Sequence, residues 1–287
     1  MNIDFTRFNE FVETFDTLEL ISLVFLLAII LEATWDIFTG RRPKGQTFAN
    51  FGIAFVNHLL DRTVYGLIFV LGLFVVENLI VWRIPLTWWS WGLALILADI
   101  TYYWMHRWEH EIRILWSYHS VHHSSPEYNL TTSLRLSWIE GLIEWIFFVP
   151  MILIGFDVIQ TLVALVIVLI YQTWIHTEKI GRLGWVDHIF NTPSVHRVHH
   201  GASPMCIDKN YGGIFIVWDH LLGTYQAENE KIRYGLTKQI RSINSIVINF
   251  YELWQIAKDI LHCRRFSHAL GYIFGKPGWQ PNDRTRK

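Results

Sequence analysis

Residues 102–123 read YYWMHRWEHEIRILWSYHSVHH and carry five of the fourteen histidines of the chain. They form a pair four residues apart and a triplet with spacings of three and one: His106, His110, His119, His122 and His123. On a helix, residues three and four apart are neighbours, about 5–6 Å apart at Cβ, so each set can point several ring nitrogens at one place. The stretch therefore predicts two helices whose histidines converge.

A second triplet with the same spacing lies further along the chain, at His196, His199 and His200. Imidazole binds zinc, copper, nickel and iron well. A single pair would be weak evidence, because a helix can carry two histidines for packing or solubility. Eight clustered imidazoles, however, exceed the four ligands of a tetrahedral zinc site, so we expect more than one metal ion.

The composition indicates a membrane protein, with 52% hydrophobic residues, 17% charged residues and 15 tryptophans. Leu18–Phe38 is long enough to cross about 30 Å of hydrocarbon. Acidic residues dominate before this stretch, whereas Arg41, Arg42 and Lys44 follow it. By the positive-inside rule the second flank is cytosolic and the N-terminus lies outside, with no cleavable signal peptide.

Further apolar stretches predict two membrane hairpins: Val64–Trp82 with Leu86–Trp104, and Gly141–Gly155 with Val158–Trp174. We expect a tight turn at residues 83–85 in the first hairpin, a turn near Gly155 in the second, and an interfacial or partly buried helix at Phe48–Leu60. Five crossings place every histidine cluster in the cytosol. The expected fold is all-α: an integral membrane protein with four to five transmembrane helices and a cytosolic, histidine-rich helical cap.

Three regions follow from this pattern: an N-terminal membrane region at 1–90, a catalytic domain at 91–225 and a basic cytosolic tail at 226–287. Residues 231–287 hold eleven Lys and Arg against three Asp and Glu, which suits anionic lipid headgroups. The net charge of −1 and the lack of a recognition motif argue against nucleic-acid binding. Cys206 and Cys263 are expected to be reduced thiols.

Residues 90–225 resemble the membrane-bound, non-haem di-iron fatty acid hydroxylase and sterol desaturase superfamily. The resemblance rests on Asp99, on Tyr102–Arg107 and on Trp116–Ser124. Further segments are similar to the alkylglycerol monooxygenases within it: Tyr128–Leu130, Tyr171–Glu178, Asn191–Gly201, Cys206–Gly213, Trp218–Asp219, Ala227–Lys231 and Gly275–Trp279.

The resemblance implies a monooxygenase that uses O₂, two iron ions and tetrahydrobiopterin to hydroxylate the ether-adjacent carbon of an alkylglycerol and release a fatty aldehyde. The eight clustered histidines would hold the iron, and the lipid substrate would come from the bilayer. Some superfamily members carry a further His-x-x-x-His pair, but here His176 is followed by Ile180. His176 is therefore either a ninth ligand or a neighbour of one. We expect His58, His188 and His220 to be structural or surface residues.

Five other residues are predicted to serve the site. Asp99 lies seven residues before His106, on the same helical face, and we expect its carboxylate to accept a hydrogen bond from a ligand imidazole. The resemblance alone implies that Tyr128 and Asn129, with Asn210 and Tyr211, contact the pterin or the glycerol headgroup.

Two alternatives stay open. One is a sterol, carotenoid or fatty acyl hydroxylase or desaturase of the same superfamily, with electrons from a ferredoxin or cytochrome. The other is a non-catalytic metal-binding membrane protein. Transporters hold their ligands near the middle of the membrane, whereas these clusters lie at the ends of the predicted spans, which disfavours the second alternative.

Overall fold

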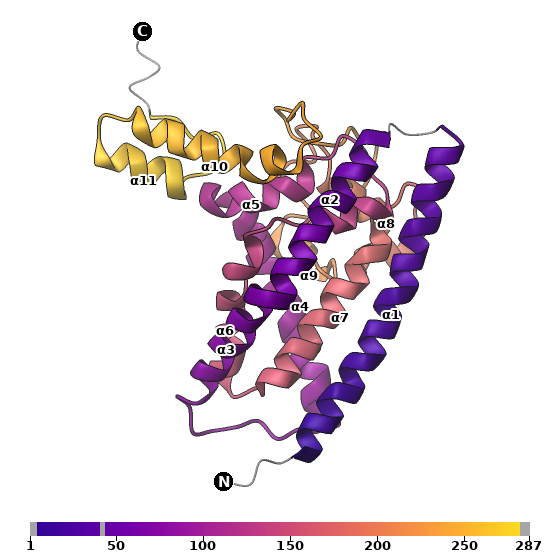
Figure 1. The fold of residues 1–287 in the computed structure, drawn as a ribbon, viewed down its shortest axis with the longest axis vertical. Helices are drawn as coiled ribbons and strands as arrows, with labels where there is room; N and C mark the ends of the chain where they lie inside the picture. The colour runs from indigo at the N-terminus through magenta and orange to yellow at the C-terminus, as the bar shows by residue number, and fades with distance from the viewer. Residues whose placement is uncertain (1–4, 41–43, 282–287) are drawn as a thin grey trace.

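A computed structural model describes residues 5–40 and 44–281 and shows long helices running side by side, with shorter helices across one end (Figure 1). The helices are α1 (Phe5–Phe38), α2 (Lys44–Leu60), α3 (Gly66–Glu77), α4 (Trp88–Glu111), α5 (Arg113–His123), α6 (Trp145–Ile154), α7 (Val158–Ile175), α8 (Pro193–His199), α9 (Val217–Leu222), α10 (Ser245–Leu261) and α11 (Phe266–Phe274). Over the described ranges the only β-pairing is two isolated bridges, Phe190 with Phe215 and Gly201 with Tyr234. The predicted all-α class is confirmed.

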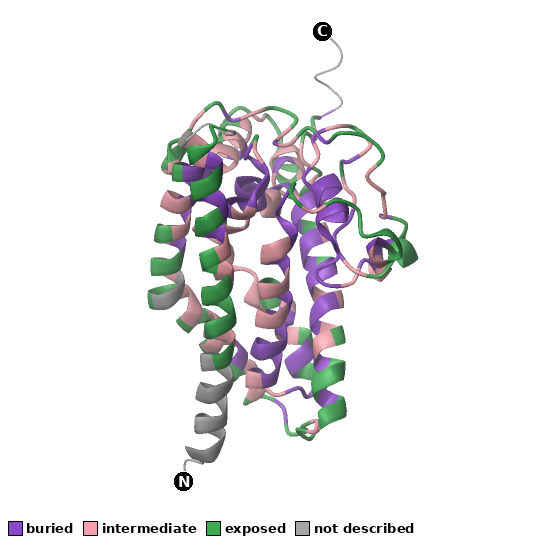
Figure 2. Cartoon of the chain, turned by 90° about the vertical axis from the view of Figure 1, so that its right-hand side faces the viewer, coloured by how far each residue is buried: buried purple, intermediate pink, exposed green. Residues whose placement is uncertain are grey.

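Three helical stretches among the described residues are long and apolar enough to cross a membrane: Leu20–Phe38, Gly45–Glu77 and Val158–Ile175. Many apolar side chains of α1 between Leu20 and Phe38 are exposed, as expected of a lipid-facing helix (Figure 2). These stretches confirm an integral membrane protein. The expected count of four to five spans and the cytosolic orientation stay predictions.

The structure corrects two expectations about the membrane region. Phe48–Leu60 is helical and partly buried, with Ile53 fully enclosed, but it is not an interfacial helix, because a π-helical turn at Asp61–Tyr65 joins α2 to α3 in one apolar segment. Residues 78–87 form a longer connection instead of a tight turn. Its backbone pairs with the second hairpin turn, where the Ile84 N–H donates to the Gly155 carbonyl at 2.8 Å.

The turn predicted at Gly155 is confirmed. Gly155 adopts φ +113°, in the left-handed region, and an added Cβ would lie 2.9 Å from the Trp82 ring, so only glycine fits here without strain. Asp157 then caps α7 by accepting hydrogen bonds from the backbone N–H groups of Ile159 and Gln160.

The main core cluster includes Ala94 and Ala98 of α4 and Leu165 and Val168 of α7, two helices that pack against each other. Gln160 of α7 also donates to the Ser90 hydroxyl of α4 at 3.0 Å. This packing brings the carboxyl ends of both helices to the same end of the molecule, the end at which α5, α10 and α11 lie (Figure 1). The histidines of α4 thereby come close to His176, which directly follows α7.

Candidate metal centre

Nine buried histidines gather into two adjoining groups at this end of the molecule. The first, called the five-histidine group, consists of His106, His110, His119, His123 and His199. The second, called the four-histidine group, consists of His122, His176, His196 and His200. Within each group the ligand atoms lie within 4.8 Å of one another, so each group could hold a metal ion. The eight predicted histidines are brought together, and His176 joins them.

The groups do not follow the sequence clusters. In α5, His119 and His123 are four residues apart and point into the five-histidine group, whereas His122 points into the four-histidine group. At α8, His199 separates from its neighbour His200 in the same way. The rings of His123 and His200 stack with centroids 4.4 Å apart, so the two groups are in direct contact.

Backbone carbonyls orient the rings of the five-histidine group. The Nδ1 atom of His106 lies 2.9 Å from the Tyr211 carbonyl oxygen, and that of His199 lies 2.9 Å from the Lys209 carbonyl oxygen. A carbonyl oxygen only accepts, so each Nδ1 donates and each Nε2 keeps its lone pair for a ligand bond. The metal-binding tautomer is therefore fixed before a metal arrives.

A carboxylate supports the same group. Glu109, 1% exposed, lies next to His110 on α4, and its Oε2 is 3.1 Å from Nδ1 of His119. Its other oxygen accepts a hydrogen bond from the Tyr118 hydroxyl at 3.0 Å. A carboxylate behind a ligand imidazole fixes the ring orientation and raises its basicity. Sequence reasoning missed Glu109, because its partner lies on the next helix and no spacing rule relates the two.

His176 stands at the centre of the four-histidine group. Its Nδ1 donates to the Gln172 carbonyl at 2.8 Å, so its Nε2 carries the lone pair. That Nε2 lies 3.1 Å from Nε2 of His122, 3.1 Å from that of His196 and 3.2 Å from that of His200. Ile180, which stands where some superfamily members have a partner histidine, has no equivalent role here.

Burial keeps most of these rings neutral. Loss of solvation lowers the pKa of His176 to about 4 and that of His199 to about 3, and it holds the pKa of His106, His110 and His196 well below the usual range. Neutral rings with converging lone pairs are unfavourable unless something positive lies between them. The donor set therefore fits soft or borderline transition metals, which prefer imidazole nitrogen.

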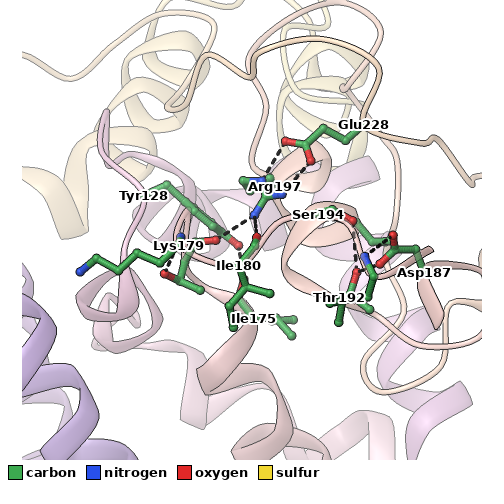
Figure 3. A network of polar contacts seen from close by, with 12 residues as sticks. Tyr128, Ile175, Lys179, Ile180, Asp187, Thr192, Ser194, Arg197 and Glu228 are labelled. Atoms are coloured by element: carbon green, nitrogen blue, oxygen red, sulfur yellow. Dashed lines mark hydrogen bonds and ion pairs between the residues drawn. The ribbon is translucent and has the colours of Figure 1, made fainter. Parts of the chain in front are cut away.

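Polar contacts outside the two histidine groups hold in place α8, which carries His196 and His199 (Figure 3). The guanidinium of Arg197, between His196 and His199, binds both oxygens of Glu228 at 2.8 and 2.7 Å. It also donates to the carbonyls of Thr177 and Ile180, at 3.0 and 2.7 Å. The bidentate contact fastens α8 to the segment around Glu228, and the two carbonyl contacts fasten it to the segment that follows His176.

An apolar cavity of about 560 Å³ leads to the histidines from the side of the membrane helices. Its inner end is lined by His119, His122 and His176. Leu165, Val166 and other side chains of α3, α4 and α7 form the walls, and Leu169, 44% exposed, lies at the outer surface. Besides the histidines and tyrosines, six polar side chains interrupt the apolar lining: Glu109, Ser133, Glu140, Glu144, Gln172 and Thr173.

The prediction for Asp99 is wrong. Its carboxylate accepts hydrogen bonds from the backbone of Ile214 and Phe215 and, at 2.8 Å, from the Trp218 indole. The Nδ1 of His106, its expected donor, is bound to the Tyr211 carbonyl. Asp99 is on the same helix as His106, but its carboxylate accepts hydrogen bonds from a loop 115 residues away in sequence.

The other four predicted residues lie close to the histidines, with much of their polar capacity already used. The Tyr128 hydroxyl donates to the Ile175 carbonyl, and the ring lies 5.1 Å from that of His200. Asn129 caps a 3₁₀ turn at Leu130–Leu134. Asn210, at φ +58°, donates to two carbonyls and accepts from the Gln226 N–H.

Tyr211 packs its ring against three rings of the five-histidine group: those of His106, His110 and His199. Its backbone N–H and that of Gly212 donate to Asp219. Burial raises the pKa of Asp219 to about 6, and this carboxylate fixes the loop that carries the Tyr211 carbonyl.

The remaining predicted non-ligands lie outside both groups. His58 is exposed on α2. The His220 ring stacks on that of Tyr225 with centroids 3.8 Å apart, and His188 lies beside them. Cys206 and Cys263 are free thiols, as expected.

Comparison with protein families identifies a fatty acid hydroxylase domain at residues 91–224. The alkylglycerol monooxygenase of Homo sapiens is 43% identical over 212 residues, which cover 73% of this chain and 47% of that protein. That of Xenopus tropicalis is 37% identical over 286 residues, covering 96% of this chain and 62% of the relative. An ornithine lipid hydroxylase of Rhizobium tropici is 31% identical over 134 residues, covering 46% of this chain and 40% of that protein.

The chain thus spans about half the length of these curated relatives, from 47% to 62% of the two alkylglycerol monooxygenases. No solved structure matches the chain significantly. The resemblance to the fatty acid hydroxylase superfamily and to its alkylglycerol monooxygenases is confirmed.

Proposed function

We propose, because residues 91–224 match the fatty acid hydroxylase family, that this chain is a membrane-bound, di-iron lipid monooxygenase acting on alkylglycerols. The observation that carries the proposal is the meeting of an apolar cavity with two histidine groups. A lipid chain in this cavity would end beside the metal ligands. The names of the similar proteins supply the substrate class.

We assign one iron ion to each histidine group. Imidazole nitrogen suits iron, although zinc, copper and nickel would also bind. Bound iron with O₂ supplies an oxidant strong enough for an unactivated C–H bond, which no side chain provides. The nine histidines would hold the metals, and the carbonyl and carboxylate partners of His106, His119, His176 and His199 keep the Nε2 of these rings aimed inward.

The chain's own residues determine where oxidation occurs. Leu165, Val166 and their neighbours hold the alkyl chain by excluding water from it. Glu140, Glu144 and Gln172 offer hydrogen-bond acceptors and a donor for the glycerol hydroxyls. The ether carbon, which joins the two parts of the substrate, would then lie next to the histidines.

Hydroxylation at this carbon gives a hemiacetal, which breaks to a fatty aldehyde and glycerol. The reaction needs a reductant, and we propose tetrahydrobiopterin. A ferredoxin or cytochrome is the alternative donor.

The test is metal analysis combined with an aldehyde-release assay on purified protein in lipid nanodiscs. With iron, O₂, reduced pterin and an alkylglycerol, wild type should release fatty aldehyde. His123→Ala should abolish release and lose iron, whereas His188→Ala, outside both groups, should match wild type. Iron-loaded wild type that oxidises a sterol or fatty acid but no alkylglycerol would overturn the substrate assignment. Bound iron with no lipid-dependent O₂ consumption would overturn the enzyme assignment.

A further inference from the structure

A second cavity, called the polar cavity, reaches the five-histidine group from another direction. It holds about 600 Å³ and is lined at its inner end by His110, His123 and His199. Its other walls come from α5, α10 and the loops around residues 201–208, 235–238 and 276–280. None of these segments belongs to the three apolar stretches that could cross a membrane.

The two cavities divide the histidines between them. The apolar cavity touches His119, His122 and His176, and the polar cavity touches His110, His123 and His199, with no lining residue in common. A molecule bound in one cavity is therefore separated from the other cavity by the imidazole rings. A lipid would fill the apolar cavity, so the polar cavity is open to a water-soluble molecule at the same time.

The charges around the polar cavity balance. Three basic side chains and three carboxylates line it: Arg113, Lys238, Lys276, Asp208, Glu252 and Asp259. Arg113 is itself neutralised, since it pairs with Glu252 at 2.9 Å and with Asp259 at 2.8 Å. Such a lining favours an uncharged ligand with several donors and acceptors over a phosphate-bearing one such as a nicotinamide dinucleotide.

The lining also offers an aromatic side chain beside the ligand rings. The Trp116 ring lies 5.0 Å from that of His110 and 5.6 Å from that of His123, centroid to centroid. Aromatic rings stack well on planar heterocycles. A flat molecule beside Trp116 would come within reach of the five-histidine group.

We infer that the polar cavity binds the reductant, a small, uncharged, reduced N-heterocycle of the tetrahydropterin class; this rests on the proposed monooxygenase function. Monooxygenation places one oxygen atom of O₂ in the C–H bond and reduces the other to water, which consumes two electrons and two protons. The tetrahydro ring supplies both electrons and both protons and leaves as a dihydro ring. Reductant and lipid therefore approach the histidines from separate cavities.

The test fills each cavity in turn. Gln255→Trp, on α10, and Thr237→Trp, at an exposed loop position, narrow the polar cavity, and Val166→Trp narrows the apolar one. Tetrahydrobiopterin binding is measured by equilibrium dialysis, and the KM for pterin and for alkylglycerol is measured alongside iron content. The polar-cavity variants should weaken pterin binding about tenfold or more with the lipid KM and iron content unchanged. Val166→Trp should instead raise the KM for alkylglycerol, with pterin binding and iron content unchanged.

Hydrogen exchange on wild type gives a readout without mutation. Saturating tetrahydrobiopterin should protect residues 235–238 and α10 but leave α7 unchanged, and NADPH should protect neither. Pterin affinity that is unchanged in both polar-cavity variants, or protection confined to α7, overturns the inference while aldehyde release by wild type leaves the proposed function standing. Cavity-dependent pterin binding without aldehyde release instead contradicts the proposed function.

Discussion

The two histidine groups differ in what supports them. The five-histidine group draws its rings from α4, α5 and α8, has the Glu109 carboxylate behind His119 and borders both cavities. The four-histidine group depends on His176 at the end of the membrane helix α7, and none of its rings forms an ion pair in the part of the chain that the structure describes. One group is therefore supported by charge, and the other by the position of a single helix end.

Low pH should empty both histidine groups, and this is the largest effect that we expect. Buried histidines have lowered pKa values, to about 4 at His176 and about 3 at His199, whereas unfolded histidines titrate near 6.5. Below about pH 6.5 the unfolded chain binds more protons than the folded one, so the metal-free protein loses stability as the pH falls, by up to about 1.4 kcal/mol per pH unit for each such histidine.

Protons also compete with metal for the lone pairs. Metal analysis after dialysis at about pH 7.5 and about pH 5 should show both metals lost at the lower pH. Thermal unfolding of the metal-free protein should show the accompanying drop in Tm. Metal-free protein that is equally stable at both pH values would show that the histidines are not neutral when buried.

His176→Ala should separate the groups. It removes the ring whose Nε2 lies 3.1–3.2 Å from three others, so the four-histidine group loses its centre. We expect metal content to fall from two ions per chain to one, with aldehyde release reduced by roughly 100-fold or more. His188→Ala is the matched control. Retention of both metals would make His176 a neighbour of the site and not a ligand.

Glu109→Gln should act on the other group alone. The amide can still accept a hydrogen bond from His119 but loses the negative charge that raises the basicity of the ring. Metal affinity at the five-histidine group should fall about 10- to 100-fold, with the second site unaffected. Chelator titration followed by metal analysis resolves the two sites. Equal weakening of both would show that they act as one unit.

Helical periodicity predicted the histidines that converge, but it could not predict how they divide. His119, His122 and His123 share a cluster in sequence and part into two groups in space, because α5 presents His119 and His123 to the histidines of α4 and His122 to His176, which follows α7. Spacing within one helix contains no information about its neighbours. His176 stayed undecided for the same reason, since its partners come from α5 and α8.

The membrane region shows the same limit. Hydropathy located the apolar stretches, and Gly155 with Asp157 marked a turn by local chemistry. Hydropathy did not reveal that α2 and α3 join, because the polar residues at 61–63 look like a break and are absorbed by a π-helical turn. Asp99 was placed on the correct face, but its partners lie in a loop that no local pattern connects to it.

Asp99→Asn carries the smallest expected effect and tests that correction. Asn keeps the size of the side chain, but its amide can no longer accept from all three donors, namely the Ile214 and Phe215 N–H groups and the Trp218 indole. One buried donor left unpaired costs about 1–3 kcal/mol, so Tm should fall by a few degrees. Because Asp99 contacts neither histidine group, both metals should be retained at wild-type affinity. Loss of metal from the five-histidine group alone would show that the loop after Tyr211 transmits the change to His106, and that this group depends on its loops as the other depends on α7.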